Sequence, residues 1–162
     1  MIRLTAPVNP AYADSAQVDA GGYRGGALQV TLGGVDDTPV FGMSGAWQRS
    51  FITASELTNV RLSFWYKLAQ TGAYESDELS QLLLSVNGVF YGEDVDSYVD
   101  QIVGEGPGSG PHTTGWQFFE VQLGTLAAGE HTLTLGGFNN HKTSNTRTEI
   151  LIDEIMVKAG EE

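Results

Sequence analysis

Few residues of this chain have the types and spacing that catalysis requires. The histidines belong to no motif of the HExxH or GxSxG kind, and the sequence contains no cysteine that could act as a nucleophile. Glu120 and Glu149 are the pair of carboxylates that two facing strands could bring over a cleft, as glycoside hydrolysis requires. With 20 acidic residues in the chain, such a pair arises easily by chance. The sequence therefore favours a protein without catalytic activity.

Aromatic side chains with polar neighbours point instead to the binding of sugars, whose rings stack on aromatic rings while amides, carboxylates and arginine bond the hydroxyls. Trp65 shares one face of its expected strand with Arg61, Ser63 and Lys67, and we predict that Trp65, Arg61 and Lys67 bind an acidic polysaccharide. The alternative is that a loop covers the ring, and residues 92–115 are the expected cover. The other predicted ligand-binding residues are Trp47, Tyr98, Asn139 and Asn140.

The elements that must position these residues are strands. Residues 60–68 alternate apolar and polar side chains, residues 82–86 and 116–123 do the same, and no segment shows a helical period. Asn87-Gly88 is a strong signal for a two-residue hairpin turn between strands. Residues 9–20 are small and polar and are predicted to form a loop. The pattern predicts an all-β chain of about eight strands in two packed antiparallel sheets.

The alternation of apolar residues breaks once near the C-terminus. Ile150 and Ile152 point to one side of a strand, and Ile155 and Val157 need the same side, which strict alternation forbids. One extra residue at Asp153–Glu154 restores the pattern, so we predict a β-bulge there. Two roles remain open for Asp153: the bulge aims its carboxylate at a ligand or metal, or the residue only caps an edge of the sheet.

Composition excludes several classes of partner. Twenty acidic and eight basic residues give a formal net charge of −12, which disfavours nucleic acid and an anionic membrane surface. No apolar run is long enough to span a membrane, and the first residues lack the pattern of a signal peptide. The length of 162 residues predicts a single domain spanning residues 1–162. Excess acid suits solubility, calcium binding or a salty extracellular setting.

The C-terminal sequence GEHTLTLGGFNNHKTSNTRTEILIDEIMV resembles the end of the jelly-roll, galactose-binding-like β-sandwich domains of bacterial secreted proteins. RLSFWY at 61–66, YESDE at 74–78, LLLSVNG at 82–88 and GWQFFEVQLGTL at 115–126 fit the same resemblance. The domains in question are carbohydrate-binding modules, polysaccharide-degrading enzymes and calcium-binding adhesins. The resemblance implies a jelly-roll sandwich and one structural calcium ion. Its implied ligands are Asp19, backbone carbonyls of the Gly22–Arg24 turn (Gly22 and Arg24), and Asp153.

The function expected from these observations is a non-catalytic carbohydrate-binding module, part of a larger extracellular protein, with a polysaccharide or glycan as its partner. The first alternative is a structural or adhesive domain of a large calcium-dependent surface protein without a sugar pocket. The second is a small polysaccharide lyase or hydrolase. All three rest mainly on the resemblance, because one fold serves many functions.

Overall fold

The computed structural model describes residues 12–34, 42–72, 74–92, 98–106, 108–140 and 146–160. This part of the chain contains eleven strands and no helix that could cross a membrane. The strands are β1 (Ala13–Gly22), β2 (Gly25–Gly33), β3 (Met43–Thr53), β4 (Leu57–Gln70), β5 (Leu79–Val86), β6 (Val89–Tyr91), β7 (Tyr98–Val103), β8 (His112–Thr113), β9 (Gln117–Leu126), β10 (Gly129–Asn139) and β11 (Arg147–Ala159).

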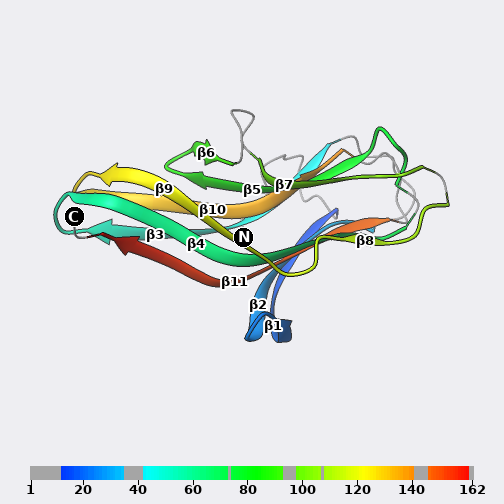
Figure 1. The fold of residues 1–162 in the computed structure, drawn as a ribbon, viewed down its shortest axis with the longest axis horizontal. Coiled ribbons are helices and arrows are strands. Elements are labelled where there is room, and N and C mark those ends of the chain that lie inside the picture. Colours follow the sequence, from blue (N-terminus) through cyan, green and yellow to red (C-terminus); the bar gives the residue numbers. More distant parts are fainter. Residues whose placement is uncertain are drawn as a thin grey trace.

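The strands form two antiparallel sheets that pack face to face. Sheet A has the order β3-β10-β5-β6, with β7 also paired to β5, and sheet B has the order β1-β2-β11-β4-β8, with β9 also paired to β4. Most strands run along the long axis of the molecule, while the β1–β2 hairpin turns away from it (blue in Figure 1). The predicted antiparallel β-sandwich of jelly-roll type is confirmed.

The inner faces of the two sheets form the hydrophobic core. Leu62 and Phe64 of β4 and Ile150 and Ile152 of β11 are fully buried, as the alternation in the sequence predicts. Removing each such side chain from water contributes about 1.5–3 kcal/mol. Because alternate residues face the core, the residues between them necessarily line the outer faces of the sheets.

The predicted β-bulge in β11 is confirmed. Asp153 pairs with Trp65 and Met156 pairs with Ser63, so three steps along β11 oppose two steps along β4. Glu154 takes up the extra residue with a φ of 53°, a left-handed conformation that is uncommon outside glycine. The bulge returns Ile155 and Val157 to the inner side of sheet B, where both line a cavity between the sheets.

Two local predictions had opposite outcomes. Asn87 and Gly88 both have positive φ and join Val86 to Val89, so the two-residue hairpin turn is confirmed. The loop predicted at residues 9–20 is wrong where the structure describes it, because residues 13–18 pair with residues 27–32 in sheet B. β1 is an edge strand with mostly exposed side chains, and an edge strand does not require apolar alternation.

A buried polar network connects the two sheets at one end of the sandwich. The hydroxyl of Thr148 in β11 bonds with the hydroxyls of Tyr74, at 3.0 Å, and Ser80. Nδ2 of Asn139 in β10 donates to Tyr74 Oη at 2.8 Å and to Thr148 Oγ1 at 2.9 Å. All four side chains are buried. The network therefore fixes β5 and β10 of sheet A against β11 of sheet B.

Because of Tyr74, this network loses stability at alkaline pH. Burial raises the pKa of its phenol above the ordinary value of a tyrosine, which is about 10. The unfolded chain releases the phenolic proton at about pH 10, while the folded chain retains it. The contribution of Tyr74 to the free energy of unfolding is therefore fully present below about pH 10 and is lost as the pH rises through the folded pKa. We expect the wild type to lose unfolding free energy above about pH 10 more steeply than Tyr74→Phe. Urea titrations at neutral and alkaline pH measure how the unfolding free energy of each protein changes with pH. Equal changes in the two proteins would contradict a raised pKa of Tyr74.

Candidate functional site

Three rows of side chains cross the outer face of sheet A, each row contributed by four paired strands. Their order follows the register of β3, β10 and β5 with β6 or β7. The rows are Gln48-Thr134-Ser85-Phe90, then Ala46-Gly136-Leu83-Tyr98, then Ser44-Phe138-Gln81-Gln101. The middle row has small residues at its β3 and β10 positions, while the rows beside it carry larger polar and aromatic groups. We call this surface the outer groove.

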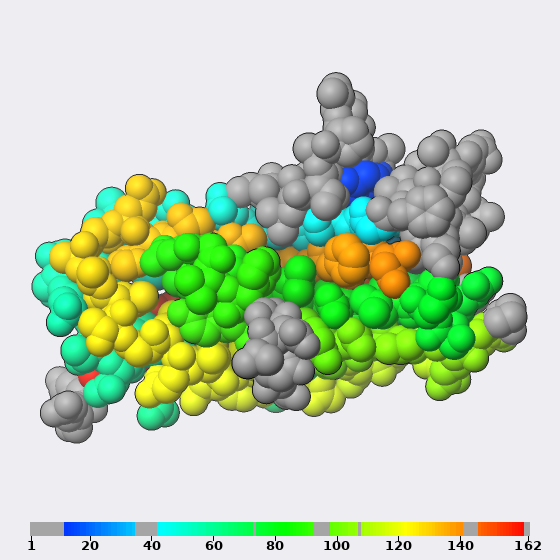
Figure 2. Space-filling view, turned by 90° about the horizontal axis from the view of Figure 1, so that it is seen from above, coloured from blue at the N-terminus to red at the C-terminus, as the bar shows by residue number. Residues whose placement is uncertain are grey.

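Glycine keeps the floor of the outer groove low. A Cβ at Gly136 would collide with the carbonyl oxygen of Gly45 and with Ala46 on the neighbouring strand β3. The close approach of β3 and β10 therefore excludes any larger residue at this position. The resulting hollow has a volume of about 240 Å³, with Leu83, Phe90 and Thr134 among its lining residues. It lies over the first two rows, while Tyr98 and the third row flank it. The β5–β6 hairpin and β10 lie at the surface of the molecule in Figure 2 (green and orange).

The polar side chains of the outer groove are uncharged. Gln81 Nε2 donates to Gln101 Oε1 at 2.8 Å, and Gln48 Nε2 donates to Thr134 Oγ1 at 3.2 Å. Each of these amides retains further donor and acceptor capacity. The ring of Phe90 is 49% exposed at one end of its row. The groove therefore offers neutral hydrogen-bonding groups beside an aromatic surface, which suits a ligand with many hydroxyl groups.

Trp65 lies on the outer face of sheet B, as predicted, but its ring is covered. Tyr23 from the turn between β1 and β2 stacks on it with a centroid distance of 3.7 Å and an interplanar angle of 9°. Phe118 packs against Trp65 at 5.4 Å, and Trp116 meets Tyr23 edge-on at 6.0 Å. The ring contacts thus come from the β1–β2 turn and from β9, and none comes from the described parts of the predicted cover, residues 92, 98–106 and 108–115. Trp116 therefore belongs to this outer cluster and not to the core between the sheets.

The two predicted cationic neighbours of Trp65 are also engaged within the protein. Arg61 lies 3.6 Å from Glu120, and the ammonium of Lys67 lies 5.7 Å from the ring centroid of Trp116. Glu120 offsets the positive charge of Arg61, which an acidic polysaccharide would need, and the Trp116 ring provides a contact for Lys67 within the protein. The outer face of sheet B therefore presents an aromatic cluster that covers Trp65, beside one ion pair and one cation–π contact.

We expect Trp65→Ala to lower the free energy of unfolding by about 2 kcal/mol, because it removes a half-buried ring and its stacking on Tyr23. Phe118→Ala is the matched control, since Phe118 is 53% exposed and its loss should cost less. Denaturant titration measures both changes. An unchanged stability of Trp65→Ala would mean that the ring is an open platform, as the acidic-polysaccharide prediction requires.

Asp153 fastens the β1–β2 turn to the bulge. Its Oδ2 accepts a hydrogen bond from the backbone N–H of Arg24 at 2.8 Å, and its Oδ1 accepts one from the backbone N–H of Glu154 at 2.7 Å. The Arg24 guanidinium lies 3.9 Å from the Glu154 carboxylate. Of the two roles left open by the sequence, this geometry matches the capping of a sheet edge.

The residues assembled around Asp153 do not fit a calcium ion. Both carboxylate oxygens of Asp153 already accept N–H groups, and a cationic side chain lies beside the adjacent Glu154, whereas calcium takes six to eight oxygen ligands. Asp19 is exposed on β1, and Gly22 pairs with Gly25 across the turn. Within the described residues, no three acidic or histidine side chains gather as a metal site would require. Calcium binding stays a prediction.

Asp153→Ala distinguishes a capping role of Asp153 from a calcium site. We expect it to lower the free energy of unfolding by about 1 kcal/mol, the net value of hydrogen bonds of this kind at an exposed position. The loss should persist in excess chelator, because the contacts require no metal. A calcium site predicts the reverse: chelation lowers the melting temperature of the wild type, and the variant no longer responds.

The remaining predicted site residues are distributed over the molecule. Tyr98 lies in the middle row of the outer groove. Trp47 faces the space between the sheets and donates its indole N–H to Gln29 O at 3.0 Å. Asn139 belongs to the buried network, and Asn140 bonds the backbone of Leu79 and Asp77. The structure therefore brings only Tyr98 of this set to the groove.

The two carboxylates considered for glycoside hydrolysis do not meet. Glu120 is level with Ser63 on β4, and Glu149 is level with Ala69. Six positions along a strand correspond to about 20 Å, well beyond the separation of a catalytic carboxylate pair. Glu149 accepts a hydrogen bond from Gln29 Nε2 at 2.8 Å. The register thus excludes this pair as an acid and nucleophile.

Sequence reasoning missed most of the outer groove. Gln48, Gln81 and Gln101 each occupy a polar position of an alternating strand, which a single sequence cannot distinguish from an ordinary solvent-facing position. Their proximity depends on the order β3-β10-β5-β7, which joins segments that are distant in sequence. The signal that was available is the absence of charge at these positions.

No protein-family model and no curated protein matches the chain. Among solved structures, it is similar to the family 11 carbohydrate-binding module from Clostridium thermocellum in complex with a β-1,3-1,4-mixed-linked tetrasaccharide. The identity is 14%, the TM-score is 0.35, and the match covers 93% of this chain and 84% of that one.

Two further similar structures are a module described for specific mannan recognition and one specific for non-crystalline cellulose. The first has 13% identity, a TM-score of 0.36 and coverages of 92% and 85%. The second has 13% identity, a TM-score of 0.38 and coverages of 92% and 89%. All three structures are carbohydrate-binding modules, one of the classes whose domains the sequence resembles. At these identities and TM-scores, the ligand has to be inferred from the residues of this chain.

Proposed function

We propose that this chain is a non-catalytic carbohydrate-binding module that holds a neutral polysaccharide or glycan in the outer groove. The observation that supports this most directly is the glycine-floored hollow, which lies beside uncharged polar side chains and the exposed ring of Phe90. Hydroxyl groups of a sugar exchange hydrogen bonds with amides such as those of Gln48 and Gln81, and the ring of Phe90 offers a stacking surface. A neutral ligand suits the groove because none of its twelve positions carries a charged side chain.

The outer face of sheet B supports a carbohydrate site less well. Tyr23 already occupies the face of Trp65 on which a sugar would stack, and Arg61 already has an acidic neighbour. An acidic polysaccharide would have to displace these contacts, while the net charge of −12 would repel it at low ionic strength. The acidic-polysaccharide prediction therefore gives way to a neutral ligand on sheet A. A location outside the cell and a larger parent protein remain parts of the proposal that rest on the sequence resemblance.

Electrophoresis through gels that contain a dissolved polysaccharide tests the proposal. We expect at least one neutral polymer from a panel of glucans, mannans and xylans to slow the protein, and an acidic polymer such as polygalacturonate to leave its mobility unchanged. Retardation by acidic polymers alone would contradict the choice of groove. Unchanged mobility across the whole panel would favour the structural or adhesive domain, which has no sugar site.

A further inference from the structure

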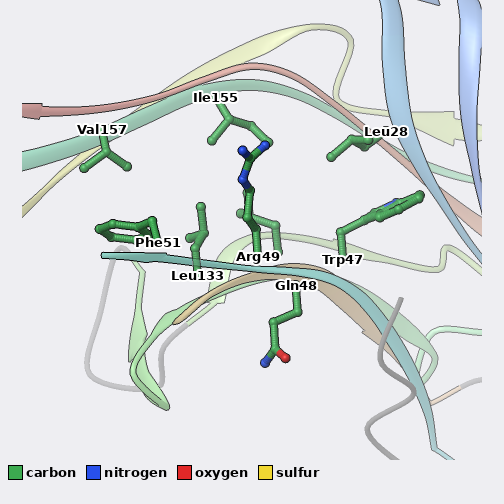
Figure 3. Close-up of a pocket in the computed structure, with 9 residues that line it drawn as sticks. Leu28, Trp47, Gln48, Arg49, Phe51, Leu133, Ile155 and Val157 are labelled. Atoms are coloured by element: carbon green, nitrogen blue, oxygen red, sulfur yellow. The ribbon is translucent and has the colours of Figure 1, made fainter. Parts of the chain in front are cut away.

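A second and larger cavity lies between the two sheets, on the opposite face of sheet A from the outer groove. Its volume is about 580 Å³, and its walls are mainly apolar. Sheet A contributes Trp47, Phe51 and Leu133, and sheet B contributes Leu28, Ile155 and Val157. These side chains point toward one another across the space in Figure 3, whereas Gln48 points away from it.

The cavity exists because the sandwich does not close at this end. β2 pairs with β11 as far as Ile152 and then leaves the sheet, so the rest of β11 pairs only with β4 within the described residues. Beyond the bulge, Ile155 and Val157 are each 37% exposed, although they face inward, while Ile150 and Ile152 before it are fully buried. Interiors of proteins are otherwise close-packed. The inward-facing surface at this end is thus accessible to a ligand.

Arg49 gives this cavity one positive charge. It lies between Trp47 and Phe51 in β3, and all three side chains face inward by strand alternation. Its guanidinium points toward Ile155 in Figure 3. No hydrogen bond or ion pair joins it to another side chain of the described residues. An arginine that faces an apolar cleft without an acidic neighbour has the geometry to receive an anionic group, because its planar fork matches a carboxylate.

We infer that the cavity between the sheets binds an amphipathic carboxylate, a molecule with an aliphatic chain and one carboxylate group. The chain would contact the leucine, isoleucine, valine and aromatic walls, and the carboxylate would pair with Arg49. The volume lies within the range of about 300–1,000 Å³ that is typical of small-molecule sites. A sugar fits poorly, because the cavity lacks the amide rows of the outer groove. This site is therefore separate from the proposed glycan site in position and in ligand class.

Calorimetric titration with dodecanoate, below its micelle concentration and at neutral pH, tests the inference. We expect saturable binding of one molecule per chain, and weaker binding of dodecanol, which has the same chain without the charge. Arg49→Gln should weaken dodecanoate binding about tenfold or more, since hydrogen bonds to charged groups are the strong ones, and should leave dodecanol binding unchanged. Arg61→Gln is the matched control, because Arg61 lies on the outer face of sheet B.

A second variant, Val157→Asp, tests the same site independently of Arg49→Gln. Val157→Asp places a negative charge at the exposed side of the cavity and should weaken dodecanoate binding while the fold is retained. No saturable binding of dodecanoate to the wild type would overturn the inference, as would equal affinities for acid and alcohol. Equal effects of Arg49→Gln and Arg61→Gln would also overturn it. Retardation of Arg49→Gln in polysaccharide gels should match the wild type, so failure of this site and of the glycan site are distinguishable.

Discussion

Thr148→Val should lower the free energy of unfolding by about 3 kcal/mol, although it changes the size of the side chain very little. The hydroxyl of Thr148 is fully buried and bonds with Tyr74, Ser80 and Asn139. Valine leaves these polar groups without that partner in a dry environment, and each such loss costs about 1–3 kcal/mol. Denaturant titration followed by tryptophan fluorescence measures the change.

Thr125→Val is the control for this substitution. Thr125 is exposed on β9, so the same chemical change there should alter stability by no more than about 0.5 kcal/mol. A loss below about 1 kcal/mol for Thr148→Val would show that the network adds little to the junction of the two sheets. In that case, apolar contacts alone would hold this end of the sandwich.

Phe90→Ala should weaken glycan binding by about thirtyfold, measured as the loss of retardation in the gel that retains the wild type. Truncation of an aromatic side chain on which a ligand stacks can cost about 2 kcal/mol, which corresponds to this factor. The stability should stay nearly unchanged, because the ring is 49% exposed in the free protein.

Val89→Ala is the matched control for the loss of binding. Val89 precedes Phe90 in the same short strand and is 59% exposed, but it lies outside the three rows of the groove. We expect Val89→Ala to bind as the wild type does. Equal losses for the two variants would point to a disturbed hairpin rather than to a contact with the sugar.

Local rules of the sequence predicted much of the fold. The break in alternation between Ile152 and Ile155 placed the bulge in β11, because the core accepts only one set of apolar residues. Asn87-Gly88 marked the β5–β6 hairpin, since both residues tolerate positive φ. β1 escaped prediction because its edge position allows polar residues on both faces, so neither period nor apolar content distinguishes it from a loop.

The candidate site was less accessible from the sequence because it depends on contacts between distant segments. The polar face of Trp65 left two roles open, a ligand platform or a covered ring, and only the folded chain shows that Tyr23, 42 positions earlier in the sequence, covers it. The outer groove has no local signature, since its polar residues alternate with core residues as on any exposed sheet. Register across four strands, rather than composition, brings Gln48 and Gln101 to one surface.

The central claim is that a neutral glycan binds the outer face of sheet A, and an NMR titration tests it most directly. Backbone amide shifts are followed while a soluble oligosaccharide, cut from the polymer that retains the protein in gels, is added. We predict that the largest changes fall on Gln48, Gln81, Phe90, Tyr98 and Thr134. Changes concentrated on Tyr23, Trp65 and Phe118 would place the ligand on sheet B and contradict the account.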